Sequence, residues 1–166
     1  MVAQLEWART SRRPYADTTN QFGIRFSLDA LLAQVELALL EPEYAHALTL
    51  STALTEYLAH NQMRHYQPAA LLLHARALMN AAQLDRAAQT LHAARELAEQ
   101  MKAYWRLWQV LAALGELETA RGDSAAADAS RAQARAWIEY IAARTPTELR
   151  AVFLQTPRVR AVLETG

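Results

Sequence analysis

Apolar side chains recur at intervals of three and four residues along most of the chain, which is the spacing of one face of an α-helix. The first clear run follows Ser27, a residue type suited to cap a helix, and stops at Pro42. Proline, glycine and short polar segments divide the rest of the chain into further runs. The pattern predicts helices over about 28–41, 43–61, 68–81, 84–102, 104–121 and 124–143.

Signals for helix ends support these limits. Gly122 follows the fifth run and is the residue type that most often ends a helix, and Asp123 or Ser124 can cap the sixth helix. Thr145-Pro146-Thr147-Glu148 has the layout of a capping box with proline in the first turn, and Thr156-Pro157 repeats the Thr-Pro start. Two short helices are therefore expected to close the chain.

Residue composition also favours an all-α fold. Alanine and leucine together make up 61 of the 166 residues, whereas the chain has only four glycines and five prolines. These two residue types, with Arg, Glu and Gln, are strong helix formers. No segment alternates β-branched or aromatic residues with polar ones between hairpin turns, so no β-sheet is expected.

The sequence overlays itself when it is shifted by 40 residues. Small residues coincide at two positions, which suits helices that cross closely, and large apolar residues coincide at others. The matching sets are Val35, Ala75 and Gly115; Ala47, Ala87 and Ala127; Leu31, Leu71 and Leu111; Leu54, Ala94 and Ala134; and Tyr57, Leu97 and Trp137.

This overlay predicts one helical-repeat domain, a short α-solenoid of three antiparallel helix pairs at about 25–61, 65–102 and 104–143. Each pair alone would leave an apolar face that stacking covers. An N-terminal stub, 1–24, precedes the pairs, and a C-terminal cap, 145–166, follows them. In the cap, apolar residues are expected to cover the sixth helix while three arginines stay in water. These residues are Val152, Phe153, Val159, Val162 and Leu163, with Arg150, Arg158 and Arg160 outside.

The chain resembles tetratricopeptide-like repeats over roughly residues 3–163. The likeness rests on a small residue in the first helix, a turn, then Ala with Leu or an aromatic residue in the second; the positions are Ala75, Ala87, Leu91 and Ala94, and Gly115, Gly122 and Ala127. The 40-residue period and the segment 105–121 are similar to the helical arrays of maltose-activator-like transcription regulators and related signal-transduction NTPases or cyclases. The resemblance implies a bacterial regulatory protein. The chain has no phosphate-binding loop or DNA-binding helix-turn-helix, so NTPase, cyclase and promoter-binding activities are not implied.

The N-terminus leaves two alternatives open. Residues 3–9, with Leu5 and Trp7, look like the end of a repeat's second helix that lacks its partner. The chain is then a segment of a longer protein, with exposed apolar surface at this end and self-association through it into a homodimer. The other alternative is a natural short protein with one leading helix. The polar stretch from Thr10 to Gln21 is expected to be largely irregular.

Charge and composition exclude several classes of protein. Lys+Arg and Asp+Glu both number 17, so the chain has no basic surplus for nucleic-acid binding, and it has no cysteine for disulfides or thiolate chemistry. No apolar run is long enough to span a membrane, and a cytoplasmic location is expected. The serines lie outside nucleophile motifs and the five histidines form no zinc pair, so neither catalysis nor a cofactor is expected. His74 is expected to be a partly buried packing residue.

The best candidate site is a surface on the first helices of the pairs, which line the concave face in tetratricopeptide-like arrays. Carrying this over gives ten groove residues: Asp29, Leu32, Glu36, Leu39, Arg76, Met79, Asn80, Gln109, Glu116 and Thr119. Glu36, Arg76 and Glu116 would form an acid–base–acid ladder. The ladder is either part of a ligand groove or a set of ion pairs between repeats.

Two functions remain open at this stage. The first is a non-enzymatic protein-interaction or sensor domain that binds a peptide, a protein partner or other domains of its parent protein. The second is a domain that binds a small effector molecule in the same groove. The aromatic residues Trp105, Trp108, Trp137 and Tyr140 are expected to serve packing within and between repeats.

Overall fold

The computed structural model describes the backbone of residues 18–40 and 44–164, and the side chains from residue 27 onward. All the regular elements in this part of the chain are α-helices, as the composition predicts. They are α2 (Thr18–Ala38), α3 (Tyr44–His60), α4 (Gln67–Asn80), α5 (Leu84–Gln100), α6 (Tyr104–Arg121), α7 (Ser124–Arg144), α8 (Thr147–Gln155) and α9 (Pro157–Glu164).

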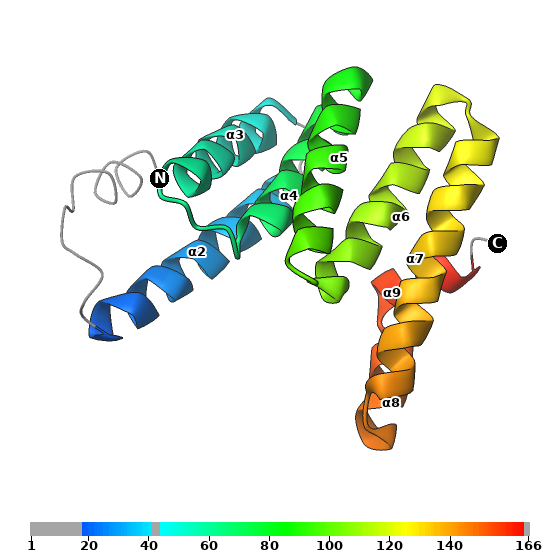
Figure 1. Ribbon diagram of the computed structural model, residues 1–166. Coiled ribbons are helices and arrows are strands. Elements are labelled where there is room, and N and C mark those ends of the chain that lie inside the picture. Colours follow the sequence, from blue (N-terminus) through cyan, green and yellow to red (C-terminus); the bar gives the residue numbers. More distant parts are fainter. Residues whose placement is uncertain (1–17, 41–43, 165–166) are drawn as a thin grey trace.

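Helices that follow one another along the chain pack against each other, from α2 through to α7 (Figure 1). In addition α4 contacts both α2 and α6, so these three helices share one side of the molecule. The short helices α8 and α9 lie against α7. Within the described residues α2 does not pack extensively against α7, as it would in a closed bundle. The architecture is therefore a sequence of neighbouring helix pairs.

The turns between helices recur every 20 residues. Gln62, Ala82, Lys102 and Gly122 all have a positive φ, between 53° and 82°. At each turn the amide of the next residue donates to a carbonyl five residues back, for example Gln83 to Leu78 at 2.9 Å. This is the Schellman arrangement, which satisfies carbonyls at a helix end. One helix plus one such turn occupies 20 residues, which accounts for the 40-residue period of a pair.

Burial follows the 40-residue overlay. The small residues that coincide, Val35, Ala75 and Ala87 among them, are at most 2% exposed, and Ala127 is fully buried. The large residues that coincide near the second-helix ends, Tyr57, Leu97 and Trp137, are all partly buried. The prediction that Ala87 and Ala127 are buried is confirmed. Equivalent positions therefore have equivalent environments.

Gly115 shows why a small residue is needed where α6 crosses α7. A Cβ atom added at this glycine would lie 2.9 Å from Cγ of Arg131 and 3.3 Å from the carbonyl oxygen of Ala127. Such separations are shorter than ordinary van der Waals contact. The absence of a side chain at Gly115 lets Arg131 cross the helix and reach the hydroxyl of Thr119, with 2.6 Å between Nη2 and Oγ1.

One prediction about the first helix is wrong: α2 begins at Thr18, so Ser27 lies inside the helix rather than at its cap. The last four residues of the stretch from Thr10 to Gln21 are helical, and the rest of that stretch lies outside the described residues. Thr, Asn and Asp have low helix propensity, but a helix already formed extends by one hydrogen bond per residue. The stub with Leu5 and Trp7 lies outside the described residues.

The C-terminal cap is confirmed for some residues and corrected for others. Phe153 and Val159 are buried beside Trp108 and Ile138, whereas Val152 is 63% exposed and covers nothing. Successive residues of α8 are rotated by about 100° around the helix axis, so Val152 points outward while its neighbour Phe153 points inward. Val162 and Leu163 are partly buried against the same cluster.

One of the predicted helix caps forms, and another does not. Asp123 caps α7, because its carboxylate accepts a hydrogen bond from the amide of Ala126 at 3.0 Å. Thr145 does not form the predicted capping box. Its hydroxyl donates instead to the carbonyl oxygen of Ile141 at 2.8 Å, which satisfies the end of α7 rather than the start of α8. The hydroxyl of Thr156 likewise donates to Phe153, at the end of α8.

Candidate ligand groove

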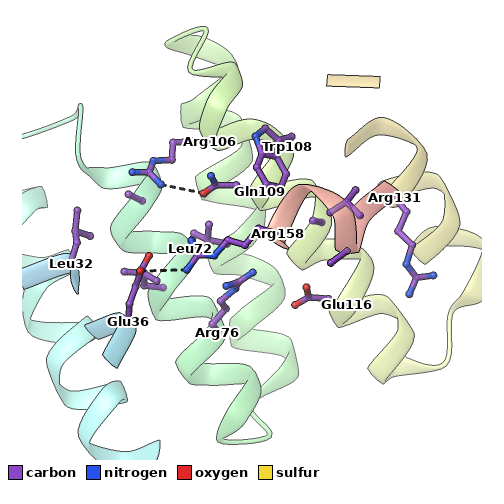
Figure 2. Close-up of a pocket in the computed structure, with 15 residues that line it drawn as sticks. Leu32, Glu36, Leu72, Arg76, Arg106, Trp108, Gln109, Glu116, Arg131 and Arg158 are labelled. Carbon is purple, nitrogen blue, oxygen red and sulfur yellow. Dashed lines mark hydrogen bonds and ion pairs between the residues drawn. The ribbon is translucent and has the colours of Figure 1, made fainter. Parts of the chain in front are cut away.

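A groove runs between α2, α4 and α6 and is closed on one side by α9. It consists of two adjoining hollows with volumes of about 220 and 320 Å³. The hollows share Glu36, Leu73, Arg76, Glu116 and Arg158 in their walls. Figure 2 shows the side chains of Glu36, Arg76, Glu116 and Arg158 converging on the same space from four helices. We call this surface the groove.

The first hollow lies near Trp108 and Gln109. Its floor is apolar and includes Leu32, Leu72 and Leu73. The second hollow continues past Leu39 and Leu40, which follow α2, and toward the end of α4. The charged and polar residues that line the first hollow are Glu36, Arg76, Arg106, Trp108, Gln109, Glu116, Arg131 and Arg158.

Eight of the ten predicted groove residues line one or both hollows: Leu32, Glu36, Leu39, Arg76, Met79, Asn80, Gln109 and Glu116. Asp29 and Thr119 do not line either hollow. Thr119 is engaged elsewhere, because its hydroxyl donates to the carbonyl oxygen of Gly115 and accepts from Arg131. Asp29 is exposed on α2. Most of the residues named from the resemblance therefore lie along the hollows, and Asp29 and Thr119 lie outside them.

The predicted acid–base–acid ladder of ion pairs does not form. Glu36, Arg76 and Glu116 line the same groove, yet within the described residues Arg76 has no carboxylate within 4.0 Å. Glu36 instead pairs with Arg158 on α9, with 3.4 Å between Oε2 and Nη2. Arg158 remains exposed to water, as predicted, but its ion pair with Glu36 was not predicted. A one-dimensional repeat pattern contains no information about α9, which lies outside the repeats.

Among the charged and aromatic residues of the groove, sequence reasoning missed three besides Arg158. Arg106 precedes Gln109 by three residues and therefore shares its helix face, and its Nη1 donates to Oε1 of Gln109 at 3.1 Å. Trp108 belongs to the cluster beneath the C-terminal helices and also borders the first hollow. Arg131 reaches the groove from α7 across Gly115. The i,i+3 spacing of Arg106 was a signal for its position, whereas the others depend on helix packing.

Positive charge dominates the first hollow, which is lined by four arginines and two glutamates. Arg131 is already held by Asp128 at 3.2 Å and by Thr119. Arg106 is partly buried, and desolvation lowers its pKa, opposed by the nearby charge of Glu36. Burial of a cation without a matching carboxylate costs free energy, so the lining favours an added negative charge.

Two buried nitrogen donors at the groove lack a hydrogen-bond partner. They are Nε of Arg76 and Nε1 of Trp108, and both residues line the first hollow. Trp108 is only 3% exposed. A buried unsatisfied donor costs about 1–3 kcal/mol, so such groups usually face water or a ligand. Both donors belong to side chains that border the first hollow.

The aromatic residues on α6 divide between core and surface. Trp108 is buried as expected, whereas Trp105 is 49% exposed and makes an edge contact with it, the ring centroids lying 6.2 Å apart. Trp137 is partly buried and stacks on Tyr104 at 4.5 Å. Tyr140 is 37% exposed. The packing role predicted for Trp105 and Tyr140 is therefore only partly correct, since one side of each ring faces solvent.

A second polar contact lies away from the groove, between α3 and α4. Oγ of Ser51 and Nδ1 of His74 are 3.0 Å apart, and Ser51 also donates to the carbonyl oxygen of Leu48. Ser51 is 1% exposed, so no substrate can reach it. Burial lowers the pKa of His74, and Arg86 lowers it further while Glu56 raises it. The pair joins two helices, and His74 is partly buried as predicted.

No group of three or more His, Cys, Asp or Glu side chains in the described part of the chain has the arrangement of a metal site. Of the helices described, none combines the length and the apolar character needed to cross a bilayer.

Comparisons with known proteins found no match to this chain among protein-family models, curated proteins or solved structures. The geometry of the groove is therefore the basis for a functional assignment.

Proposed function

We propose that this chain is a non-enzymatic recognition domain, a tetratricopeptide-like α-solenoid whose concave groove binds a peptide segment of a partner protein or of another domain. The main support is the groove itself, a continuous hollow lined by α2, α4 and α6 and containing eight residues expected there from the repeat pattern. The 20-residue recurrence of the turns and the contacts of α4 with α2 and α6 agree with a solenoid.

The length of the groove suits an extended peptide. On α4 its lining runs from Ala69 to Asn80, which covers about 16 Å at roughly 1.5 Å per helical residue. An extended chain advances about 3.3 Å per residue, so about five residues fill this length. The apolar floor can accept side chains, while Gln109, Asn80 and the arginines can bond to backbone or polar groups.

The chemistry of the lining supports binding rather than catalysis. Among the residues that border the two hollows there is no hydroxyl, thiol or imidazole group that could act as a nucleophile or a histidine base. Its carboxylates are Glu36 and Glu116. The carboxylate of Glu36 is already engaged in an ion pair with Arg158, 3.4 Å away. We therefore propose a domain that holds a ligand without transforming it.

A peptide-binding assay tests this proposal. Random hexapeptides on beads are incubated with the labelled protein and with two variants. Glu116→Trp places a large ring in the wall shared by both hollows and should abolish retention, whereas Glu96→Trp, at an exposed position on α5, should leave it unchanged. Equal retention by both variants, or none by the unmodified protein, would argue against a peptide groove.

A small-molecule effector is the second candidate. The observation that favours it is the first hollow, the smaller of the two at about 220 Å³, which the buried Trp108 and the partly buried Arg106 line. A thermal-shift screen of metabolites against the peptides selected above separates the two candidates. Stabilisation by a metabolite alone would favour the effector.

The setting of the domain is a further part of the proposal. The resemblance to helical arrays of maltose-activator-like regulators supports a sensor or scaffold segment within a larger bacterial signalling or transcription regulator. Pull-down of another domain of the same parent protein by the groove would support this setting, and loss of that interaction in Glu116→Trp would localise it.

A further inference from the structure

We infer that the groove selects acidic peptides, and that one carboxylate of the bound segment lies between Arg76 on α4 and Arg158 on α9. This inference rests on the proposed function and adds the chemical class of the ligand. Three observations on the groove support it: its charge, its unpartnered donors and the internal carboxylate that already lies beside Arg158.

Charge complementarity is the first argument. The first hollow has four arginines against two glutamates. Two of the four arginines already have an acidic partner: Arg131 is paired with Asp128, and Arg158 is paired with Glu36 at 3.4 Å. A ligand carboxylate would bring the charge of the lining closer to balance. A neutral peptide would leave the remaining cations in a partly buried, poorly solvated position.

Arg76 provides the second argument. Its guanidinium has no ion pair within the described residues, and its buried Nε has no hydrogen-bond partner. Figure 2 shows this side chain at the centre of the groove, between Arg158 and Glu116. Arginine donors match the two oxygens of a carboxylate, and such charge-assisted bonds are roughly twice as strong as neutral ones. The guanidinium is thus placed to bind an acidic side chain of the ligand.

The pair of Glu36 and Arg158 provides the third argument. Here a carboxylate of the protein itself forms an ion pair with an arginine at the groove wall, and both side chains are about half exposed. Exposed pairs of this kind are weak, so a ligand carboxylate can compete for Arg158. The internal pair then acts as a substitute for the ligand, and removing the Glu36 carboxylate should strengthen binding of acidic peptides.

The test uses two matched hexapeptide libraries on beads, one with Glu fixed at the third position and one with Gln fixed there. The unmodified protein should be retained about tenfold better by the Glu library, the effect of one charge-assisted contact. Retention by the Glu library should fall as salt is raised, because partly exposed charges are screened.

Variants assign this preference to particular residues. Arg158→Gln and Arg76→Gln should each remove most of the preference for the Glu library. Arg160→Gln, which changes an arginine that lies on the same helix and is paired with Glu164, should keep it. Glu36→Gln should increase retention on the Glu library about two- to fivefold, whereas a merely structural role for Glu36 would lower it. Circular dichroism checks that each variant is folded.

The outcomes separate this inference from the proposed function. Equal retention on both libraries overturns the acidic preference but leaves the peptide groove. No retention on either library overturns both. Displacement of the peptides by free glutamate or acetate at a concentration equal to that of the peptide would show that a small carboxylate is the ligand, and would overturn the peptide as occupant.

Discussion

The carboxylate of Glu36 on α2 lies 3.4 Å from the guanidinium of Arg158 on α9. This ion pair connects the first described helix to the last one across the groove that α4 and α6 line (Figure 2). It therefore places the C-terminal helix at the binding surface, where α9 contributes Ala161 and Val162 as well. The C-terminal segment is thus a cap for α7 and also a wall of the groove.

The Glu36–Arg158 pair should contribute little to stability. Both side chains are about half exposed, so solvent screens their attraction. A double-mutant cycle with Glu36→Gln and Arg158→Gln should give a coupling of about 0–1 kcal/mol in the free energy of unfolding. Urea denaturation measures it. A coupling well above this range would mean that the pair holds α9 in place, and ligand competition for Arg158 would then be disfavoured.

Ala87 should not tolerate a larger side chain. It is fully buried at the position where α5 packs within its pair. Ala87→Leu should lower the free energy of unfolding by about 1–3 kcal/mol, because extra methylene groups force neighbouring helices apart. Ala93→Leu, at an exposed position on the same helix, is the control and should have almost no effect. Equal denaturation midpoints for the two variants would contradict the assigned register.

Replacing the turn residues that have a positive φ with glycine should stabilise the protein. Lys102 and Ala82 are exposed and have φ values of 53° and 56°, which strain any residue with a Cβ atom. Lys102→Gly and Ala82→Gly should each raise the free energy of unfolding by about 0.5–1 kcal/mol.

Gly122→Ala serves as the reverse control for these turns. Gly122 has φ of 82° and an added Cβ would meet nothing within 4 Å, so only backbone strain changes. This variant should be destabilised by about 1 kcal/mol. Thermal unfolding that moves in the same direction for all three variants would show that backbone strain is not the cause.

His74 should make the protein less stable in mildly acidic solution. Burial and the charge of Arg86 lower its pKa in the folded state below the ordinary value of 6.5, although Glu56 opposes this. Between the folded and unfolded pKa values the unfolded chain binds more protons, so stability falls as pH drops through about 6.5. This contribution is complete above that pH.

A comparison of variants checks the role of His74. The loss of stability from about pH 7.5 to about pH 5.5 should be smaller in His74→Gln than in the unmodified protein, because glutamine does not titrate. His92→Gln changes an exposed histidine on α5 and should leave the pH dependence as it was. Identical pH profiles for all three proteins would show that His74 stays neutral and inert over this range.

Local sequence determined the helices and the face of each helix that is buried, whereas the groove residues were named from the resemblance to tetratricopeptide-like arrays. Apolar residues at helical spacing and the coincidence of Val35, Ala75 and Gly115 identified which side of each helix is buried, and eight of the ten proposed groove residues line the hollows. The buried faces follow from the 3.6-residue period and from side-chain volume, which act within one helix or between adjacent helices. Asp123 was likewise recognisable as a cap because its hydrogen bond is local.

Tertiary structure decided which partners the polar groups take and how the turns close. Arg158 reaches Glu36 only because α9 folds back across the groove, and Arg76 consequently has no carboxylate of its own. The left-handed turns at Gln62, Ala82 and Lys102 contain no glycine, so the local sequence does not mark them as turns. Packing of the helices on either side holds these residues at a positive φ. Contacts between residues far apart in sequence depend on the path of the whole chain, and local periodicity contains no record of that path.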